Sequence, residues 1–116
     1  MAKQTLTQKA DSFHVNVEVL LFEEHGSFVA YCPALELSSY GDDKNDAKNA
    51  FEEALKIFID DTSKKGTLEK FLLKLGWQLQ QKPKANYQPP QFLLRDHQAL
   101  LHKNPSVYQE RMAMPV

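Results

Sequence analysis

The sequence has few of the residues that define several protein classes. Its 116 residues include one cysteine, which excludes an intramolecular disulfide framework. No apolar run approaches the ~20 residues that a helix needs to cross a bilayer. The N-terminal stretch from Met1 to Gln8 is polar rather than signal-like. We therefore expect a cytoplasmic protein without membrane contact.

A large charge of either sign is also missing. The 14 basic and 15 acidic residues give a formal net charge of -1, so no long-range field would gather nucleic acid. Lys64-Lys65 and Lys82 to Lys84 are brief basic spots of the kind usually found on solvated surfaces. No helix-turn-helix pattern is visible. The sequence thus gives no support for direct nucleic-acid binding.

Residues for catalysis are sparse. The four glycines are all explained as turns or stops, so no phosphate-cradling loop is present. Cys32 could be a nucleophile with His25 or His14 as its base, but no activating helix N-terminus lies nearby and Pro33 follows at once. An unpaired cysteine is more often a small buried hydrophobe. We expect no catalytic residue.

Metal ligands are not spaced for coordination. No two histidines lie four apart on a helix, and His97 and His102 are five apart. The pairs Asp42-Asp43 and Asp60-Asp61 could hold magnesium in a nuclease, but acidic pairs at helix ends commonly serve capping and solubility. The sequence predicts no metal and no cofactor.

Alternating apolar residues mark the strands. Phe13 to Leu21 alternates with period two, Glu23 to Gly26 supplies a turn, and Ser27 to Cys32 returns as the second strand of a hairpin. Pro33 ends that strand, and Leu35 to Tyr40 is expected to form a short third strand.

An amphipathic helix should follow Gly41. Asp43 is a good N-cap, and Asp46 stands three residues later, close to a capping box. An apolar stripe at spacings of three and four can lie across the sheet: Ala47, Ala50, Phe51, Ala54, Leu55 and Phe58. The pattern fades at Asp60, and a second short helix is expected from Thr67 until Gly76.

The C-terminal part differs in character. Trp77 to Gln80 predicts a fourth strand, and from 83 onward prolines interrupt any regular element until a last strand over Val107 to Met114. The predicted fold is α+β, with an antiparallel sheet in β-β-β-α-(α)-β order and one long helix on one face. We assign 1–12 to a flexible N-terminus, 13–82 to the domain and 83–116 to an extended arm. The expected core is Phe13, Val15, Val17, Val19, Phe28, Ala30, Phe51, Leu55 and Phe58.

One stretch resembles a known family. Phe28 to Leu35 reads Phe-Val-Ala-Tyr-Cys-Pro-Ala-Leu, and Gly41 to Ala47 reads Gly-Asp-Asp-Lys-Asn-Asp-Ala. This pattern is similar to that of the HicB-like antitoxins, and the likeness is best from Val15 to about Trp77. After Leu35 the chain has Glu36-Leu37-Ser38 where the family commonly has a Pro-Gly-Cys-like turn.

The resemblance implies a non-catalytic binding module with a trimmed ribonuclease H fold. Its partner would be a HicA-type toxin, a small ribonuclease that cleaves messenger RNA, inhibited by covering its catalytic face. Exposed carboxylates could steer a basic toxin, and the candidate contact residues are Glu23, Glu24, Glu36, Tyr40 and Asp42. The alternative is that these are ordinary solvated side chains.

Two other functions stay open. The first is a self-assembling module without a toxin, because the arm offers apolar side chains and three or four strands leave an open edge. Homodimerisation is expected, with these candidate contacts: Phe92, Leu93, Leu94, Tyr108, Met112 and Met114. The second is a metal-dependent nuclease, for which the strands offer only Glu18 and Glu36.

Overall fold

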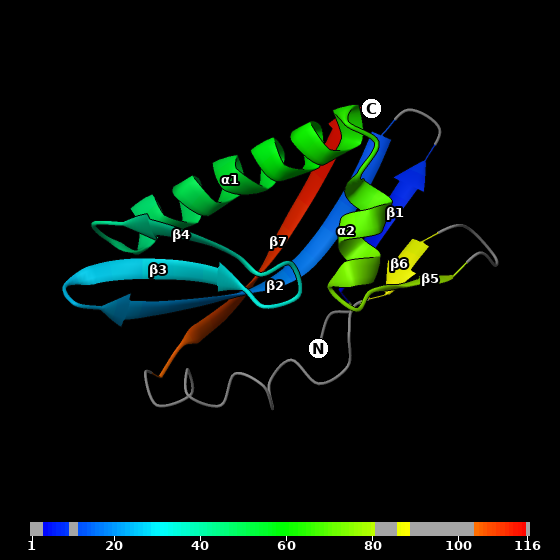
Figure 1. Ribbon diagram of the computed structural model, residues 1–116. Coiled ribbons are helices and arrows are strands. Elements are labelled where there is room, and N and C mark those ends of the chain that lie inside the picture. Colours follow the sequence, from blue (N-terminus) through cyan, green and yellow to red (C-terminus); the bar gives the residue numbers. More distant parts are fainter. Residues whose placement is uncertain (1–3, 10–11, 81–85, 89–103, 116) are drawn as a thin grey trace.

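The described part of the chain folds into one antiparallel sheet with two helices against it, which confirms the α+β class (Figure 1). The computed structural model describes residues 4–9, 12–80, 86–88 and 104–115. The helices are α1 (Lys44–Lys64) and α2 (Leu68–Lys74). The strands are β1 (Thr5–Lys9), β2 (Ser12–Glu24), β3 (Ser27–Cys32), β4 (Leu37–Gly41), β5 (Gln78–Gln80), β6 (Asn86–Gln88) and β7 (Ser106–Pro115).

The long strand β2 organises the sheet. Its residues 12–16 pair with β1 and its residues 20–24 pair with β3, while β7 pairs with residues 12–21. Because the β7 pairing overlaps both others, β1 and β3 share one edge of β2 and β7 occupies the opposite edge. Between β1 and β3 the amide of Glu18 donates to Oε1 of Gln4 over 2.8 Å. The side chain of Gln4 thus supplies a hydrogen bond to β2 at a position that lies between its pairings with β1 and with β3.

The core lies between the sheet and the helices. Helix α1 covers one face of the sheet (Figure 1). Alternate β2 residues, Val15, Val17, Val19 and Leu21, point to this face. The α1 residues that meet them are Ala47, Phe51, Leu55 and Ile59. A smaller cluster of Leu20, Phe22 and Val29, with Tyr31 against it, lies on the opposite face. The period-two pattern of β2 therefore separates two apolar layers.

The predicted core is largely confirmed. Val15, Val17, Val19, Ala30, Phe51 and Leu55 are buried, and Phe28 and Phe58 pack partly buried against them. The side chain of Phe13 lies outside the described residues. Sequence reasoning missed Leu6 and Trp77, which are buried in the same cluster.

The expected flexible N-terminus was wrong for Thr5–Lys9. This segment forms β1, which pairs with β2 on one edge and with β6 on the other. Leu6 is its fully buried residue, placed opposite Val15. A single apolar residue among polar neighbours gives no periodicity to detect, and strand pairing supplies what local propensity does not.

Helix α1 continues past the expected end at Asp60. It runs to Lys64, and in its last turns Asp60 pairs with Lys64 and Asp61 with Lys65. An acidic residue four positions before a basic one is the favourable order for such pairs. Thr62 is buried there, and its hydroxyl donates to the carbonyl of Phe58 over 2.7 Å.

The last strand was predicted over Val107 to Met114 and is confirmed as β7. It lies within the sheet beside β2 and not outside it, and β6 also joins the sheet through β1. The boundary we placed at 82/83 therefore does not mark an edge of the sheet. The strand predicted from Trp77 is β5, which pairs with β6 rather than with the first three strands.

Candidate functional site

The start of α1 follows directly on the end of β4. Asp43 is the N-cap, with extended backbone angles of φ -140 and ψ 178. Its Oδ1 accepts from the amide of Asp46 over 2.8 Å, and Oδ2 of Asp46 accepts from the amide of Asp42 over 3.1 Å. This reciprocal arrangement confirms the predicted cap. It provides hydrogen-bond acceptors for backbone amides that have no acceptor within the helix. It uses the carboxylates of Asp43 and Asp46, whereas that of Asp42 is not needed for it.

Gly41 permits this junction by its size. A Cβ built on Gly41 would lie 2.6 Å from the carbonyl carbon of Asp46 and 2.8 Å from Cα of Ala47. Both are backbone atoms of α1, so they cannot move aside as a flexible side chain would. The glycine therefore holds the first turn of the helix tightly against the edge strand β4.

The β2–β3 hairpin ends beside this junction. His25 and Gly26 form its turn with φ 52 and 84, and Glu24 pairs with Ser27 on either side. Positive φ at both positions is typical of a type I′ turn, which matches the twist of the strands. In the sheet, Glu23 pairs with Phe28 and Phe28 pairs with Gly41. Two strand spacings put Glu23 and Gly41 roughly 10 Å apart.

Carboxylates therefore gather at one end of the molecule, which we call the acidic end: Glu23, Glu24, Asp42, Asp43 and Asp46. Apart from Glu24, which is half-buried, these residues are exposed. Lys44, also exposed, is the one lysine within this stretch of α1 and its cap. The ion pairs of α1 lie further along the helix, at Glu52–Lys56, Asp60–Lys64 and Asp61–Lys65.

Tyr40 adds an aromatic ring to this end. It precedes Gly41 in β4 and pairs with Val29, which pairs in turn with Phe22. Its side chain is 65% exposed, although it stands in the same row as these two buried residues on the face away from α1. The ring is thus held on a rigid strand and remains open to a partner.

Glu36 does not join the other predicted contact residues. It lies in the turn between β3 and β4, where the amide of Glu36 donates to the carbonyl of Pro33 and its φ is 49. The predicted third strand began too early, because this turn occupies Pro33 to Glu36 and β4 starts at Leu37. Leu37 and Gly41 are at opposite ends of β4, about 13 Å apart. The structure therefore places Glu23, Glu24, Tyr40 and Asp42 at one end of the sheet, with Glu23 and Tyr40 on opposite faces, and leaves Glu36 at the far end.

The predicted oligomer contacts have mixed outcomes. Tyr108 and Met112 pack partly buried against the core of their own domain, which accounts for them without a second copy. Met114 pairs through its backbone with Phe13, and nothing is described of its side chain. Phe92, Leu93 and Leu94 lie outside the described residues, as do His97 and His102.

A cluster between α1 and β7 escaped sequence reasoning. Nζ of Lys48 lies over the ring of Tyr108, 4.9 Å from its centroid, in a cation–π contact. Burial, and then the charge of Glu52, raises the pKa of Glu110, while Lys56 and Lys48 act in the opposite direction. Burial also raises the pKa of Tyr108. The sequence shows only the four-residue spacing of Lys48, Glu52 and Lys56. This spacing does not indicate that β7 lies next to these side chains.

The cysteine behaves as a core residue. Cys32 is fully buried, and this burial raises the pKa of its thiol to about 12. Hydrogen bonds from the backbone amides of Leu35 and Ala34 lower the pKa of the thiol, but by less than burial raises it. A thiol that stays protonated and inaccessible is unsuited to nucleophilic attack.

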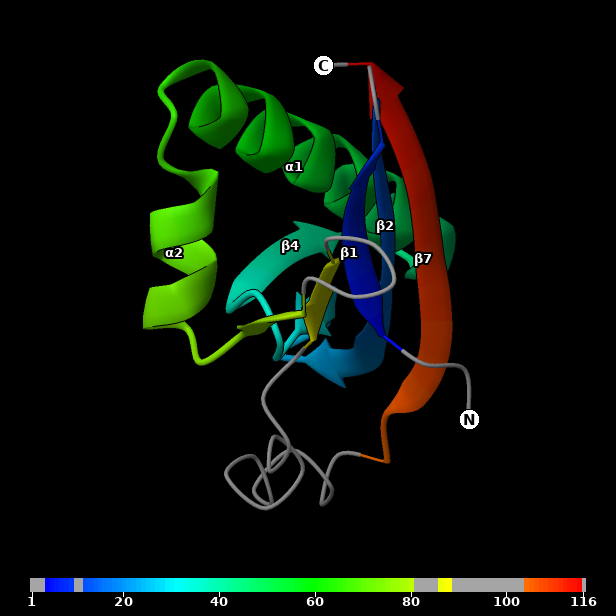
Figure 2. The ribbon, with the colours of Figure 1, turned by 90° about the vertical axis from the view of Figure 1, so that its right-hand side faces the viewer.

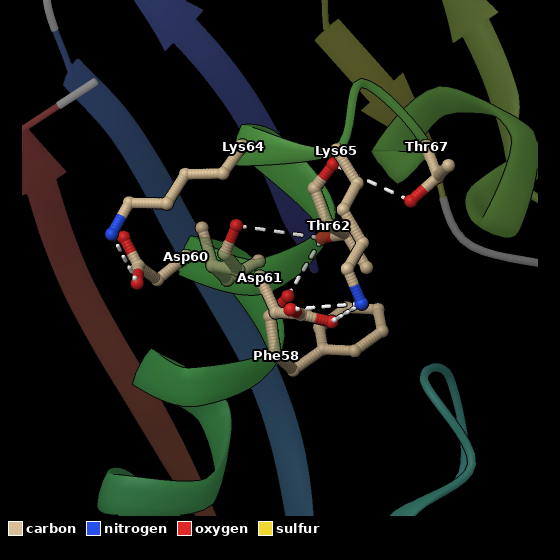
Figure 3. Close-up of polar contacts among 8 residues, drawn as sticks. Phe58, Asp60, Asp61, Thr62, Lys64, Lys65 and Thr67 are labelled. Carbon is tan, nitrogen blue, oxygen red and sulfur yellow. Dashed lines mark hydrogen bonds and ion pairs between the residues drawn. The ribbon is translucent and has the colours of Figure 1, made fainter.

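The acidic pair Asp60-Asp61 is engaged by lysines (Figure 3). Oδ2 of Asp60 is 3.1 Å from Nζ of Lys64, and Oδ1 of Asp61 is 3.2 Å from Nζ of Lys65. The two carboxylates thus form ion pairs at the C-terminal end of helix α1. Among the described residues, no three His, Cys, Asp or Glu side chains gather as a metal site would require. Glu18, one of the two carboxylates considered for nuclease chemistry, lies in β2 apart from the acidic end.

A shallow groove of about 340 Å³ lies at β1, β2 and β7. Thr5, His14, Asn16 and Arg111 give it polar walls, with Val15, Met112 and Ala113 completing them. Its residues come from strands that pair directly, Asn16 opposite both Thr5 and Arg111. The groove is therefore a feature of the sheet surface and lies away from the acidic end.

The helices of the described part are not membrane spans, since none combines the required length with the required apolar character. Comparison with family models, curated proteins and solved structures finds no match to the chain. The resemblance to the HicB-like antitoxins thus rests on the sequence motif alone.

Proposed function

We propose that this chain is a non-catalytic protein-binding module that acts as a HicB-like antitoxin and sequesters a HicA-type, mRNA-cleaving toxin. The observation that carries the proposal is the acidic end, where Glu23, Asp42 and the exposed ring of Tyr40 lie at one end of the sheet, Glu23 on the face toward α1 and Tyr40 on the opposite face. These residues come from different elements and meet only in the fold. They are also not needed for the helix cap, which Asp43 and Asp46 form.

An RNA-cleaving toxin must present a basic surface to its substrate. The acidic end can occupy such a surface and exclude RNA sterically, without chemistry of its own. Complementary charge speeds encounter and selects the partner, and a rigid aromatic residue such as Tyr40 is the kind of side chain that anchors an interface. The proposed roles are therefore steering for the carboxylates and anchoring for Tyr40.

The attraction must be local. The chain's net charge is only -1, so a partner would sense the acidic end at short range. Interactions between exposed charges are screened over about 8 Å at physiological ionic strength. Binding through this end should consequently weaken as salt is raised, mainly through a slower association rate.

The test uses the tagged chain expressed at native level in its own host, with mass spectrometry of whatever co-purifies. The proposal expects a small basic protein in stoichiometric amount whose RNA cleavage stops when the chain is added. A matched pair of variants localises the contact. Glu23→Lys with Asp42→Lys should lose the partner, while Glu53→Lys with Glu69→Lys, the same charge change at exposed helix positions, should keep it. Equal binding by both variants would reject the acidic end.

A second candidate is the self-assembling module without a toxin. The observation that favours it is the outer edge of β7, since among the described residues this strand pairs only with β2. Recovery of the chain alone, as a defined oligomer, would favour this candidate over the first.

A further inference from the structure

The strand β7 has unusual regularity for an outer strand. Its ten residues pair with ten consecutive residues of β2, from Ser106 opposite Leu21 to Pro115 opposite Ser12, without a bulge. Figure 2 shows β7 along the outer margin of the molecule, with β2 on its inner side. Within the described part of the chain, the other edge of β7 pairs with no strand. It therefore offers a long row of main-chain donors and acceptors.

Such an edge is a template for another strand, and folded proteins usually block it. The common devices are shortness, a bulge, an interior proline or an edge lysine. The other outer strands, β4 and β5, are short, at five and three residues. By contrast, β7 has no lysine, and its only proline is Pro115 at the end. Of these outer strands, β7 alone is long and has neither a bulge nor an interior proline, and its charged side chains are Glu110 and Arg111.

We propose that the outer edge of β7 pairs antiparallel with β7 of a second copy of this chain, which makes one continuous sheet across a twofold axis. Twofold pairing uses the same edge in both copies, so the assembly closes as a dimer instead of growing. The edge is preformed, because Tyr108 and Met112 fix β7 to the core of its own copy. The strand also carries one charge of each sign, Glu110 and Arg111, so self-pairing accumulates no net charge.

The symmetry restricts the register. Residues opposite each other in a sheet point to the same face, so each residue must meet one of the same parity on the other strand. Centres at Glu110 and at Arg111 give equal overlaps of nine residues, 106–114 and 107–115, and the centre at Glu110 leaves out Pro115, which has no N–H to donate to a ladder. It places Tyr108 opposite Met112 and Gln109 opposite Arg111. It also places the two Glu110 side chains opposite each other, in the neighbourhood of Lys48 and Lys56 of each copy, whose charges already act on Glu110.

The opposed carboxylates give a specific expectation. Like charges directly opposite each other weaken a strand pair, so Glu110→Gln should tighten the dimer, by up to roughly fivefold in the dissociation constant. Analytical ultracentrifugation of the full purified chain measures this constant. Arg111→Gln is the matched control, since at this register Arg111 meets Gln109 and its loss should not tighten the dimer.

Cysteine cross-linking locates the axis. We would place cysteine at Gln109, Glu110 or Arg111 in turn and oxidise mildly. Disulfide-linked dimer should form at one of these positions and best for Glu110→Cys, because residues at the axis face their own counterparts. Val107→Cys is the control: this side chain is 55% exposed, but its counterpart would be about 20 Å away at the Glu110 register. The native Cys32 is buried and should not react.

These outcomes decide whether β7 pairs with β7 of a second copy, and they do not depend on a toxin. A dimer that cross-links within Gln109 to Arg111 and not at Val107 supports the edge pairing. A monomer at every concentration tested, or a dimer without cross-links at these three positions, overturns it. Loss of toxin binding in the acidic-end variants would leave this result unchanged, so failure of one proposal can be told from failure of the other.

Discussion

The indole of Trp77 donates a hydrogen bond to the carbonyl of Ala34 over 2.6 Å. Both residues are buried, although 43 positions separate them in the chain. Trp77 follows the end of α2, and Ala34 lies in the turn that leads from β3 into β4. The bond therefore ties the second helix to the turn that positions β4, whose far end carries Tyr40 and the start of α1.

Replacing Trp77 by phenylalanine should lower the free energy of unfolding by at least ~1–3 kcal/mol, the cost of leaving a buried acceptor without its donor. The indole also fills more space than the phenyl ring, which adds to the loss. The unfolding midpoint in denaturant measures the effect. Leu73→Met is the control because Leu73 is 51% exposed in the adjacent α2, and its change should be small. An unchanged midpoint for Trp77→Phe would show that the bond contributes nothing.

Gly41→Ala should destabilise the chain by about 1–3 kcal/mol, the usual cost of adding a methyl group where nothing can yield. The new Cβ would approach backbone atoms of Asp46 and Ala47 at distances that real Cβ atoms do not show. Ser38→Ala, at an exposed position of the same strand, provides the comparison. Equal unfolding midpoints for the two variants would mean that α1 can move away from β4 without loss.

Tyr108→Phe should cost no stability at neutral pH and should gain up to about 1 kcal/mol, because the buried hydroxyl finds no hydrogen-bond partner among the described residues. The phenyl ring still lies under Lys48 and still packs on the core. Tyr108→Leu removes the ring as well and should be less stable than Tyr108→Phe. Thermal unfolding of both variants measures the difference. A clear loss in Tyr108→Phe would reveal a partner for the hydroxyl.

Stability should fall as pH rises above about 9. Burial raises the pKa of Cys32 from 9.0 to about 12, so the unfolded chain loses this proton first and gains stability relative to the folded chain. The contribution of the thiol is complete below pH 9 and is lost as pH rises towards 12. By about pH 10.5 the loss from this group amounts to about 2 kcal/mol.

The variant Cys32→Ala isolates that contribution. It lacks the thiol, so its stability should fall less between pH 8 and about 10.5 than that of the native chain, even though a cavity lowers it at both values. Tyr31 and Tyr108 contribute to both proteins, because burial is the main cause of their raised pKa values and the charge of Cys32 is a lesser one. Parallel curves of unfolding free energy against pH would contradict the role of Cys32.

The elements with strong local patterns were predictable. The alternation of β2, the turn before Ser27 and the capping residues Asp43 and Asp46 are each encoded within a few neighbouring residues. β1 was not predictable, because Leu6 gains its buried place only through pairing with β2 and β6. The end of α1 was missed because ion pairs with Lys64 and Lys65, and not apolar periodicity, accompany its last turn.

For the candidate site, too, local features were predictable and contacts between strands were not. Glu23 and Glu24 flank a predictable turn, and Asp42 precedes a predictable helix, but their proximity depends on the order β2, β3, β4 in the sheet. Glu36 was grouped with them as an exposed residue of the predicted third strand. The intervening strand β4 separates it from Tyr40 and Asp42 instead. Nearness in sequence is a poor guide once a strand lies between two residues.

A quantitative affinity purification from the native host tests whether the acidic end binds a toxin. Three proteins are compared: the native chain, Glu23→Lys with Asp42→Lys, and the charge-matched Glu53→Lys with Glu69→Lys. We predict a small basic protein in stoichiometric amount with the first and third, and its loss with the second. Absence of any such protein from the native chain, or its equal recovery with all three, would rule out binding of a toxin through the acidic end.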